Sequence, residues 1–438
     1  MRLGATVGVV AALVAVAAGC GGSKKSSGST TSSTSNVSGT VTFDGVWTSS
    51  TGQKQFQAVI DGFNKLYPKV HVNYKPVGNN LPTVLSTSVA GGHPPDMADI
   101  AQPGTIQQFA TQGKLKPITY ASSVMDQNFA PAWKQLGTFN GTLYALVFKA
   151  ANKSLVWYNV PAFKDAGVSA PKTLTQLLSD AKTIKASGTP AYSIGGAEGW
   201  TLTDMFENIY LRTFGPAKYE ALSQHKITWT DPSVKTALTT MGKILGDTSN
   251  IAGGTSGALQ YSFNQSVTNA FATPPKAAMV FEADFVGGVI ASSTKAKAST
   301  GFNTFPWPEI TPGADASAVE IAGDLMVTFR DTPAIEAFVK YLATPQAAEI
   351  WAKQGGFGTG NKNVPASVYP DSITKAAEAP LLTANSVVFD MSDEQPPAFG
   401  GTAGQGEWGL FQKFLQSPSN VTGIQQQLES AATAAYKK

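Results

Sequence analysis

The sequence predicts an α/β protein whose main body holds two domains. Segments in which apolar and polar residues alternate, as in strands, are interspersed with segments in which apolar residues recur every three or four positions, as in helices. The body, about residues 40–438, is too long for one ordinary domain. Hydrophobic residues make up 42% of the chain, which is typical of a protein with a buried core.

The first half of the body begins with a strand at 40–47, TVTFDGVW. A helix follows, because Phe56, Val59, Ile60, Phe63 and Leu66 share one helical face and Pro68 then ends it. Further strands are expected, in order, at 70–77, 96–100, 141–150 and 154–159.

The second half is richer in helices. Strands are expected at 277–282 and 320–329. Helical periodicity covers 173–187, 201–214, 232–246 and 262–272, and most of the chain after 329 is helical as well. This alternation predicts largely parallel sheets. The glycine-rich stretch 400–406 is expected to be a mobile loop, and no internal repeat is present.

The N-terminal residues predict export. Arg2 is followed by an uncharged run to Gly19 that ends in small residues, which is typical of a secretory signal peptide over residues 1–19. An uncleaved N-terminal anchor is the alternative. Cys20 is the only cysteine in the chain, so no disulfide is expected. The sequence AAGC resembles a bacterial lipobox, and the Gly, Ser and Thr residues that dominate 20–39 predict a flexible tether behind a lipid-modified Cys20.

Charge and composition exclude several classes of partner. Net charge is only +3, and of 32 basic residues only Arg2, Arg212 and Arg330 are arginines. Nucleic-acid and phosphate recognition relies heavily on arginine. No basic cluster, metal-ligand spacing or phosphate-binding loop is present. We therefore expect no nucleic-acid partner, no cofactor and no metal.

Eight segments, taken in order, resemble one family. They are GGHPPDMADIAQPG (91–104), GKLKPI (113–118), NGTLYALVFKAANKSLVWYN (140–159), GWTLTDMFENIYLR (199–212), PPKAAMVFEADFVGG (274–288), GDLMVTF (323–329), GGFGTGNKNVP (355–365) and FDMSDEQP (389–396). Together they resemble the extracellular sugar-binding lipoproteins of ABC importers, family 1, in the α-glucoside-binding branch. The resemblance covers essentially the whole mature chain. It departs from the branch where Trp408 stands behind a glycine-rich stretch.

The resemblance implies a two-lobed, periplasmic-binding-protein-like fold of type II, with hinged lobes and a ligand cleft between them. The chain is expected to cross between the lobes near Lys149, Phe305 and Gly356. Lobe 1 would then comprise residues 40–148 and 306–356, and lobe 2 residues 150–305 and 357–438. Closure of the lobes on a ligand would tell a membrane permease that the protein is loaded.

Sugar recognition requires aromatic planes for the C–H faces of a pyranose ring and polar side chains for its hydroxyl groups. Residues of both kinds stand at the ends of expected elements. The candidate sugar-binding residues are Trp47, Asp99, Gln102, Gly104, Trp200, Asp204, Glu282, Asp284, Trp307, Asp324, Phe357, Asp393 and Trp408.

Each candidate also has a purely structural interpretation. Trp133, Trp157, Trp229 and Trp351 are assigned to the core, whereas the small residues around Trp47, Trp200 and Trp408 favour loops. Asp324 can instead satisfy backbone groups at a strand bend.

Three further carboxylates have helix-terminus alternatives. Glu282 and Asp284 can stand at a solvated helix start. Thr201 can cap a helix that has Asp204 at its N3 position.

Three function classes follow. The first is a receptor that captures a neutral sugar, such as maltose, sucrose, trehalose or a short α-glucan, and delivers it to an ABC permease. The second is a secreted glycosidase that uses Glu282 and Asp284 as acid and base. The third is an envelope lipoprotein without a small ligand. We favour a non-enzymatic, monomeric receptor held outside the cytoplasm by lipid on Cys20.

Overall fold

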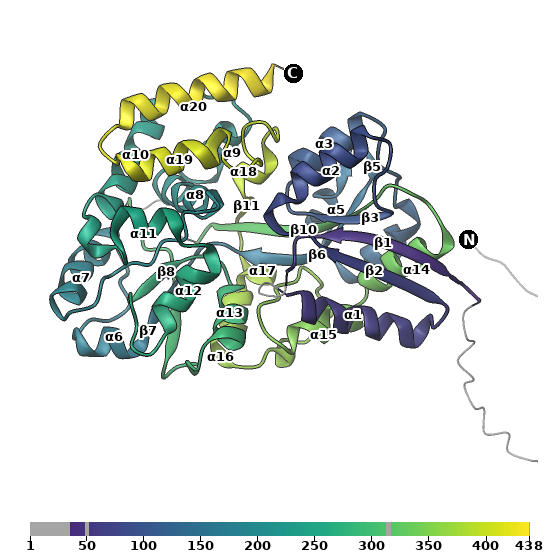
Figure 1. Cartoon of the computed structure of the whole chain (residues 1–438), viewed down its shortest axis with the longest axis horizontal. Coiled ribbons are helices and arrows are strands. Elements are labelled where there is room, and N and C mark those ends of the chain that lie inside the picture. The colour runs from purple at the N-terminus through teal and green to yellow at the C-terminus, as the bar shows by residue number, and fades with distance from the viewer. Residues whose placement is uncertain (1–35, 49–51, 312–316, 438) are drawn as a thin grey trace, which may run out of the picture. The chain divides into compact units, whose positions relative to one another are not determined.

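The computed structural model describes residues 36–48, 52–311 and 317–437 (Figure 1). The predicted signal peptide, Cys20 and most of the predicted tether lie outside these residues.

The strands fall close to their predicted positions. They are β1 (Gly39–Gly45), β2 (Val70–Pro76), β3 (Met97–Ile100), β4 (Thr138–Phe139), β5 (Thr142–Leu143), β6 (Ala145–Asn152), β7 (Leu155–Asn159), β8 (Met279–Phe281), β9 (Phe302–Pro306), β10 (Val319–Thr328) and β11 (Val387–Phe389). The expected strand 141–150 is divided into β5 and β6. β5 pairs with β4 in a hairpin whose tight turn holds Asn140 and Gly141 at positive φ, whereas β6 pairs with β10.

Helices make up most of the rest. Those before residue 230 are α1 (Gln53–Leu66), α2 (Leu81–Ala90), α3 (Pro103–Thr111), α4 (Ser122–Asn128), α5 (Pro131–Gln135), α6 (Val160–Asp165), α7 (Leu174–Ala186), α8 (Trp200–Phe214) and α9 (Pro216–Ser223). Those after it are α10 (Pro232–Leu245), α11 (Gly254–Gln260), α12 (Phe263–Phe271), α13 (Val286–Ser293), α14 (Pro333–Leu342), α15 (Pro345–Ala352), α16 (Ser372–Glu378), α17 (Pro380–Thr383), α18 (Met391–Glu394), α19 (Gly406–Gln416) and α20 (Val421–Tyr436).

Two main sheets organise these elements. The larger has the order β11-β10-β3-β1-β2, with β6 paired to β10, and the smaller has the order β8-β7-β9. The prediction of largely parallel sheets holds only for part of the larger sheet, where β1 runs parallel to β2 and β3, and β10 runs parallel to β11. β10 runs antiparallel to β3 and β6, and the smaller sheet is antiparallel throughout. Local alternation shows where strands lie but not their direction, because β10 returns to β3 from more than 200 residues away in the chain.

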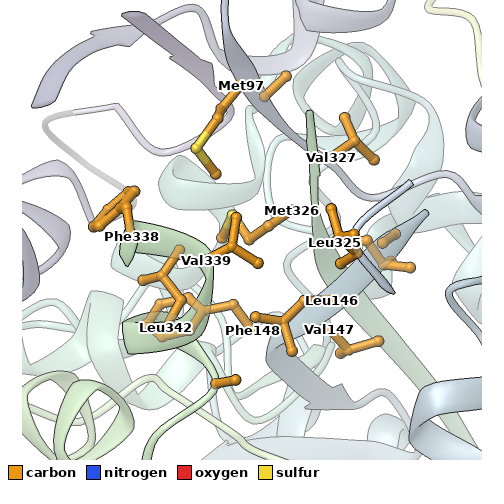
Figure 2. Packing of buried hydrophobic residues seen from close by; sticks show 14 of the residues in the cluster. Met97, Leu146, Val147, Phe148, Leu325, Met326, Val327, Phe338, Val339 and Leu342 are labelled. Carbon is orange, nitrogen blue, oxygen red and sulfur yellow. The ribbon is translucent and has the colours of Figure 1, made fainter. Parts of the chain in front are cut away.

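The first hydrophobic cluster surrounds the larger sheet. Figure 2 shows part of it, where Phe338, Val339 and Leu342 of α14 gather with Met326 of β10 and Phe148 of β6. These side chains are almost completely removed from water. Burial of one such side chain stabilises the fold by about 1.5–3 kcal/mol. The cluster draws on 41–150 and 319–389.

A second large cluster gathers residues 156–318 and 388–435, and a smaller third one lies beside it around α12 and α13. Helix α8 is the centre of the second cluster and packs against α9, α10 and α19 (Figure 1). Residues 201–212 of α8 are all buried, so its polar side chains must find partners inside the protein.

The chain passes between the two large clusters at three places: over 151–155, at 318–319 and over 382–390, where Val388 packs in the second cluster, Phe389 in the first and Met391 again in the second. The first passage lies just after Lys149. Phe305 and Trp307 pack in the second cluster and Phe357 packs in the first.

Within the described ranges, no helix combines the length and the apolar character needed to cross a membrane.

Candidate functional site

Two adjoining pockets, of about 150 and 180 Å³, lie where elements of both clusters meet. They share six lining residues, so we treat them as one cavity with two ends. The shared residues are Val46, Asn79, Lys149, Trp200, Phe285 and Asp324. The first end adds Gln102, Lys153, Asp390, Asp393 and Trp408, and the second end adds Trp47, Gln55, Phe263 and Trp351.

Trp47 is fixed just beyond β1 by Tyr74 of β2. The Tyr74 hydroxyl accepts a hydrogen bond from the Trp47 backbone N–H at 2.9 Å and donates one to its carbonyl at 3.0 Å. The indole ring lies edge-on to Trp351, with ring centroids 4.8 Å apart. Its Nε1–H then donates to Asp324 at 3.0 Å. Trp47 therefore both belongs to the core and supports the carboxylate that faces the cavity.

Asp324 stands at a bulge in β10. The pairing of β10 with β6 shifts between Asp324 and Leu325, so Asp324 lies opposite Lys149. Their charged groups are 3.7 Å apart. The Lys149 ammonium also lies 5.0 Å from the centre of the Phe285 ring. Bulges redirect side chains next to binding sites, and this one turns a carboxylate and an ammonium group into the cavity.

Aromatic rings of the third cluster form another wall of the cavity. Trp200 is the first residue of α8, and its ring packs on Phe263 and Phe285 at centroid distances of 5.3 and 6.2 Å. Gly199 precedes it with φ near 94°, and a Cβ there would come within 2.7 Å of the Trp408 Cβ. Glycine at 199 therefore lets Trp408 of α19 lie against the start of α8. Trp200 and Trp408 stand in first helical turns and not in the loops expected from their neighbours.

Polar groups close the first end of the cavity. Gln102 stands at the N-cap of α3, and its amide donates to Asp393 of α18 at 2.9 Å. Burial and the nearby Asp390 raise the pKa of Asp393 well above its usual value. A carboxyl group in such surroundings gains from any further hydrogen-bond donor, such as a sugar hydroxyl.

Lys153 provides the cation at this end. Its ammonium contacts Asp390 at 2.5 Å and Asp204 at 2.9 Å. Burial alone would lower the pKa of Lys153, but the surrounding carboxylates outweigh burial and raise it well above the usual value. Lys153 is therefore charged at neutral pH.

The cavity brings together six of the thirteen residues predicted to bind sugar. These are Trp47, Gln102, Trp200, Asp324, Asp393 and Trp408. The other seven do not line it.

Phe357 and Trp307 are core residues. Phe357 packs between Phe148 and Trp351 in the first cluster, with centroid distances of 5.2 and 5.3 Å. Trp307 packs on Phe281 at 5.0 Å in the second. Both side chains therefore pack within hydrophobic clusters and not against the cavity.

Asp99 and Gly104 lie behind the wall. Asp99 is completely buried and accepts a 2.7 Å hydrogen bond from the backbone N–H of Val46, which does line the cavity. Gly104 allows close packing, since a Cβ there would come within 2.1 Å of the Gln395 carbonyl oxygen.

The predicted cap at Thr201 is wrong. Helix α8 begins at Trp200 after Gly199, and the Thr201 hydroxyl donates to the Gly195 carbonyl at 2.7 Å. Asp204 makes no capping bond and instead accepts from Lys153. A periodic pattern places a helix start only to within a residue or two, and a shift of one position removes the capping box.

Glu282 and Asp284 are buried, and therefore do not stand at a solvated helix start. Asp284 accepts from the backbone N–H of Asn152 at 2.6 Å. Glu282 faces Asp204 and Lys153 behind the cavity. Neither carboxyl group lines the cavity, so the pair proposed as acid and base in the glycosidase alternative does not face a substrate there.

Sequence reasoning missed several lining residues, above all Lys149, Lys153, Phe285 and Asp390. Two lysines within the apolar run ALVFKAANKSLVW were a usable signal, because a lysine in a buried segment requires a carboxylate partner.

One group of carboxylates has the spacing of a metal site. Oxygens of Asp204, Glu320 and Asp390 lie within 4.8 Å of one another. The Lys153 ammonium already contacts two of these three carboxylates and provides the compensating charge. We therefore assign no metal to this group.

Residues 47–349 match the family model of the bacterial extracellular solute-binding proteins. The osmoprotective compounds-binding protein GgtB of Synechocystis sp. (strain ATCC 27184 / PCC 6803 / Kazusa) is 31% identical over 76% of this chain and 79% of its own length. The alpha-glucosides-binding periplasmic protein AglE of Rhizobium meliloti (strain 1021) is 31% identical over 83% and 81%, respectively.

The fold matches solved structures as well. The bacterial solute receptor AcbH, described as having an exclusive preference for β-D-galactopyranose, superimposes with a TM-score of 0.79 at 19% identity. The match covers 91% of this chain and 99% of that receptor. This likeness confirms the predicted two-lobed α/β fold. From the family match, the two relatives and the fold, we conclude that the chain belongs to the bacterial extracellular solute-binding proteins, which bind solutes and are not enzymes.

Proposed function

We propose that this protein captures a neutral α-glucoside, such as maltose, sucrose, trehalose or a short α-glucan, and delivers it to the permease of an ABC importer. The observation that carries the proposal is the cavity, where Trp200, Trp408 and Phe285 face the polar groups of Asp324, Asp393 and Gln102. Aromatic planes suit the C–H faces of a pyranose, and carboxylates and amides suit its hydroxyl groups.

The balance of charges supports a neutral ligand. Lys149 is paired with Asp324, and Lys153 is paired with Asp204 and Asp390. No arginine is among the described residues that line the two pockets. An anionic ligand would have to compete with carboxylates for both ammonium groups, at a large cost in desolvation.

The size of the cavity supports more than one sugar ring. Each end is smaller than the roughly 300–1,000 Å³ typical of small-molecule sites, so a disaccharide would occupy both ends. The names of AglE and GgtB, which refer to alpha-glucosides and to osmoprotective compounds, support the same class of small solute.

We propose further that the two hydrophobic clusters mark two lobes that close on the ligand. The permease would recognise the closed form. Cys20 would carry a lipid anchor after removal of residues 1–19, with the residues up to 39 as a tether, and the protein would act as a monomer. Cys20 lies outside the described residues, and its role is inferred from the AAGC sequence.

Isothermal titration calorimetry with maltose, sucrose and trehalose tests the proposal. We expect saturable binding of at least one of them and no release of glucose on prolonged incubation. A thermal-shift comparison with sugar phosphates provides the second arm. Stabilisation by a phosphorylated sugar and by no neutral one would refute the neutral-ligand assignment, and sugar hydrolysis would restore the glycosidase alternative.

A further inference from the structure

Each of the three passages between the hydrophobic clusters carries one buried ionisable residue. They are Lys153 at the first passage, Glu320 directly after the second and Asp390 at the third. Their side chains are at most 7% exposed. The three charged groups therefore lie where the chain would have to bend if the lobes moved.

Three polar residues of α8, at positions 204, 207 and 208, connect these passages. Asp204 accepts from the Lys153 ammonium at 3.0 Å. The Asn208 amide donates to the Lys153 carbonyl at 3.1 Å and to the Glu320 carboxylate at 2.9 Å. Glu207 accepts from the backbone N–H of Met391, the residue after Asp390, at 2.5 Å. One buried helix thus contacts every passage through hydrogen bonds.

The same helix begins with the aromatic wall of the cavity. The Lys153 ammonium lies 5.3 Å from the centre of the Trp200 ring, and Lys153 itself lines the cavity. Its partner Asp390 accepts from the backbone N–H of Asp393 at 3.0 Å, which orients the carboxylate at the other side of the same end. Lys153 is therefore next to the ligand space and to all three passages.

Five carboxyl groups surround Lys153 from the elements packed around it. They are Asp204 of α8, Asp390 directly after β11, Asp393 of α18, Glu282 after β8 and Glu320 of β10. Without the ammonium, Asp204 and Asp390 would repel each other in a medium of low polarity. They would have to move apart or take up protons, and Trp200 and Asp393 would shift with them.

We infer that Lys153 is a positioning residue for sugar capture. It fixes Trp200 and Asp393, which line the cavity, relative to the three passages between the lobes. The inference rests on the proposed function for its effect on affinity, but its structural part does not. On this inference, Lys153 links the ligand site to the passages that would bend when the lobes close.

Calorimetry of Lys153→Met, Lys153→Arg and the control Lys340→Met tests the inference. Lys340 pairs with Glu336 on α14 and does not line the cavity. We expect Lys153→Met to weaken sugar binding about tenfold to hundredfold. Lys153→Arg should keep most of the wild-type affinity, and Lys340→Met should bind sugar as the wild type does. A folded Lys153→Met protein with the affinity of the wild type would overturn the inference.

A readout without sugar separates this inference from the proposed function. The fluorescence of Trp200 is obtained by subtracting the emission spectrum of Trp200→Phe from that of the wild type. The same subtraction is made between Lys153→Met and Lys153→Met/Trp200→Phe. We expect the two difference spectra to differ. An unchanged spectrum would refute the positioning role, even if the wild type bound none of the sugars. If Lys153→Met does not fold, Lys153→Met/Asp390→Asn removes both charges together and is measured in the same two ways.

Discussion

Gln102 and Asp393, which are 291 positions apart in the chain, share a 2.9 Å hydrogen bond at one end of the cavity. Gln102 belongs to the region of the first hydrophobic cluster, and Asp393 follows the third passage into the second. The bond therefore joins the two halves of the binding site directly.

Replacement of Gln102 by Leu should weaken sugar binding about tenfold. The buried Asp393 carboxylate would lose its hydrogen-bond donor, and the cavity would no longer be closed at this end. The comparison is Gln107→Leu, which alters an exposed glutamine on the same helix α3. Equal calorimetric affinities for the two variants would show that the Gln102–Asp393 bond does not matter for capture.

Trp200→Ala should weaken sugar binding by about 1.5–3 kcal/mol through lost stacking and burial, with little change in the melting temperature of the free protein. Trp229→Phe provides the contrast, since Trp229 is completely buried away from the cavity and should affect melting alone. Normal affinity together with early melting in Trp200→Ala would assign Trp200 to the core.

Asp204→Asn should also weaken sugar binding, by about threefold to tenfold, because it removes one of the two carboxylates that hold the Lys153 ammonium. The measurement pairs calorimetric affinity with ligand-free melting. A change in melting without a change in affinity would limit Asp204 to a structural role.

Ligand-free stability should rise as the pH falls from about 8 to about 5.5. Burial raises the pKa of Asp204 to about 7, of Glu394 to about 7 and of Asp284 to about 6. A carboxyl group whose pKa is raised on folding binds protons more tightly in the native state. The contribution of such a group to the free energy of unfolding is complete below its pKa in the unfolded state. It is lost as the pH rises through its pKa in the folded state.

Melting temperatures across that range check this expectation. Glu394→Gln should flatten the curve, because it removes one of the groups that titrate there. The carboxyl groups with lowered pKa, such as Asp231 and Asp247, act only at more acidic pH and do not reverse the trend. A melting temperature that falls steadily on acidification from 8 to 5.5 would contradict the assignment of these buried groups.

Cys20→Ser should release the protein from membranes and leave its sugar affinity unchanged, because we propose Cys20 as the lipid attachment point and assign it no part in the cavity. Fractionation of cells and calorimetry of the released protein measure the two effects. A folded Cys20→Ser protein that stays in the membrane fraction would favour an uncleaved N-terminal anchor.

The elements could be predicted well because their signals are local. The face formed by Phe56, Val59, Ile60 and Phe63 is buried in α1 as the spacing indicates. Strand direction was not predictable, since it depends on β10 pairing with segments far away in the chain.

The site could be predicted only in part. Gln102 and Trp200 stand at element ends, where ligand contacts concentrate, and they do line the cavity. Asp324 also lines it, but from a bulge in the middle of β10 that arises from the pairing with β6. Asp284 and Trp307 also stand near element ends, but nothing local distinguishes an end that faces the cavity from one that faces the core. Lys153 was missed because its carboxylate partners come from α8 and the end of β11, and only the fold brings them together.

A crystal structure of the protein with the sugar that binds most tightly in calorimetry tests the central claim most directly. We predict a pyranose ring against Trp200, with its hydroxyl groups bonded to Asp324 or Asp393 and a second ring towards Trp47 and Trp351. A sugar bound elsewhere on the protein, or a saturated crystal in which this cavity holds no sugar, would contradict the claim that this cavity is the capture site.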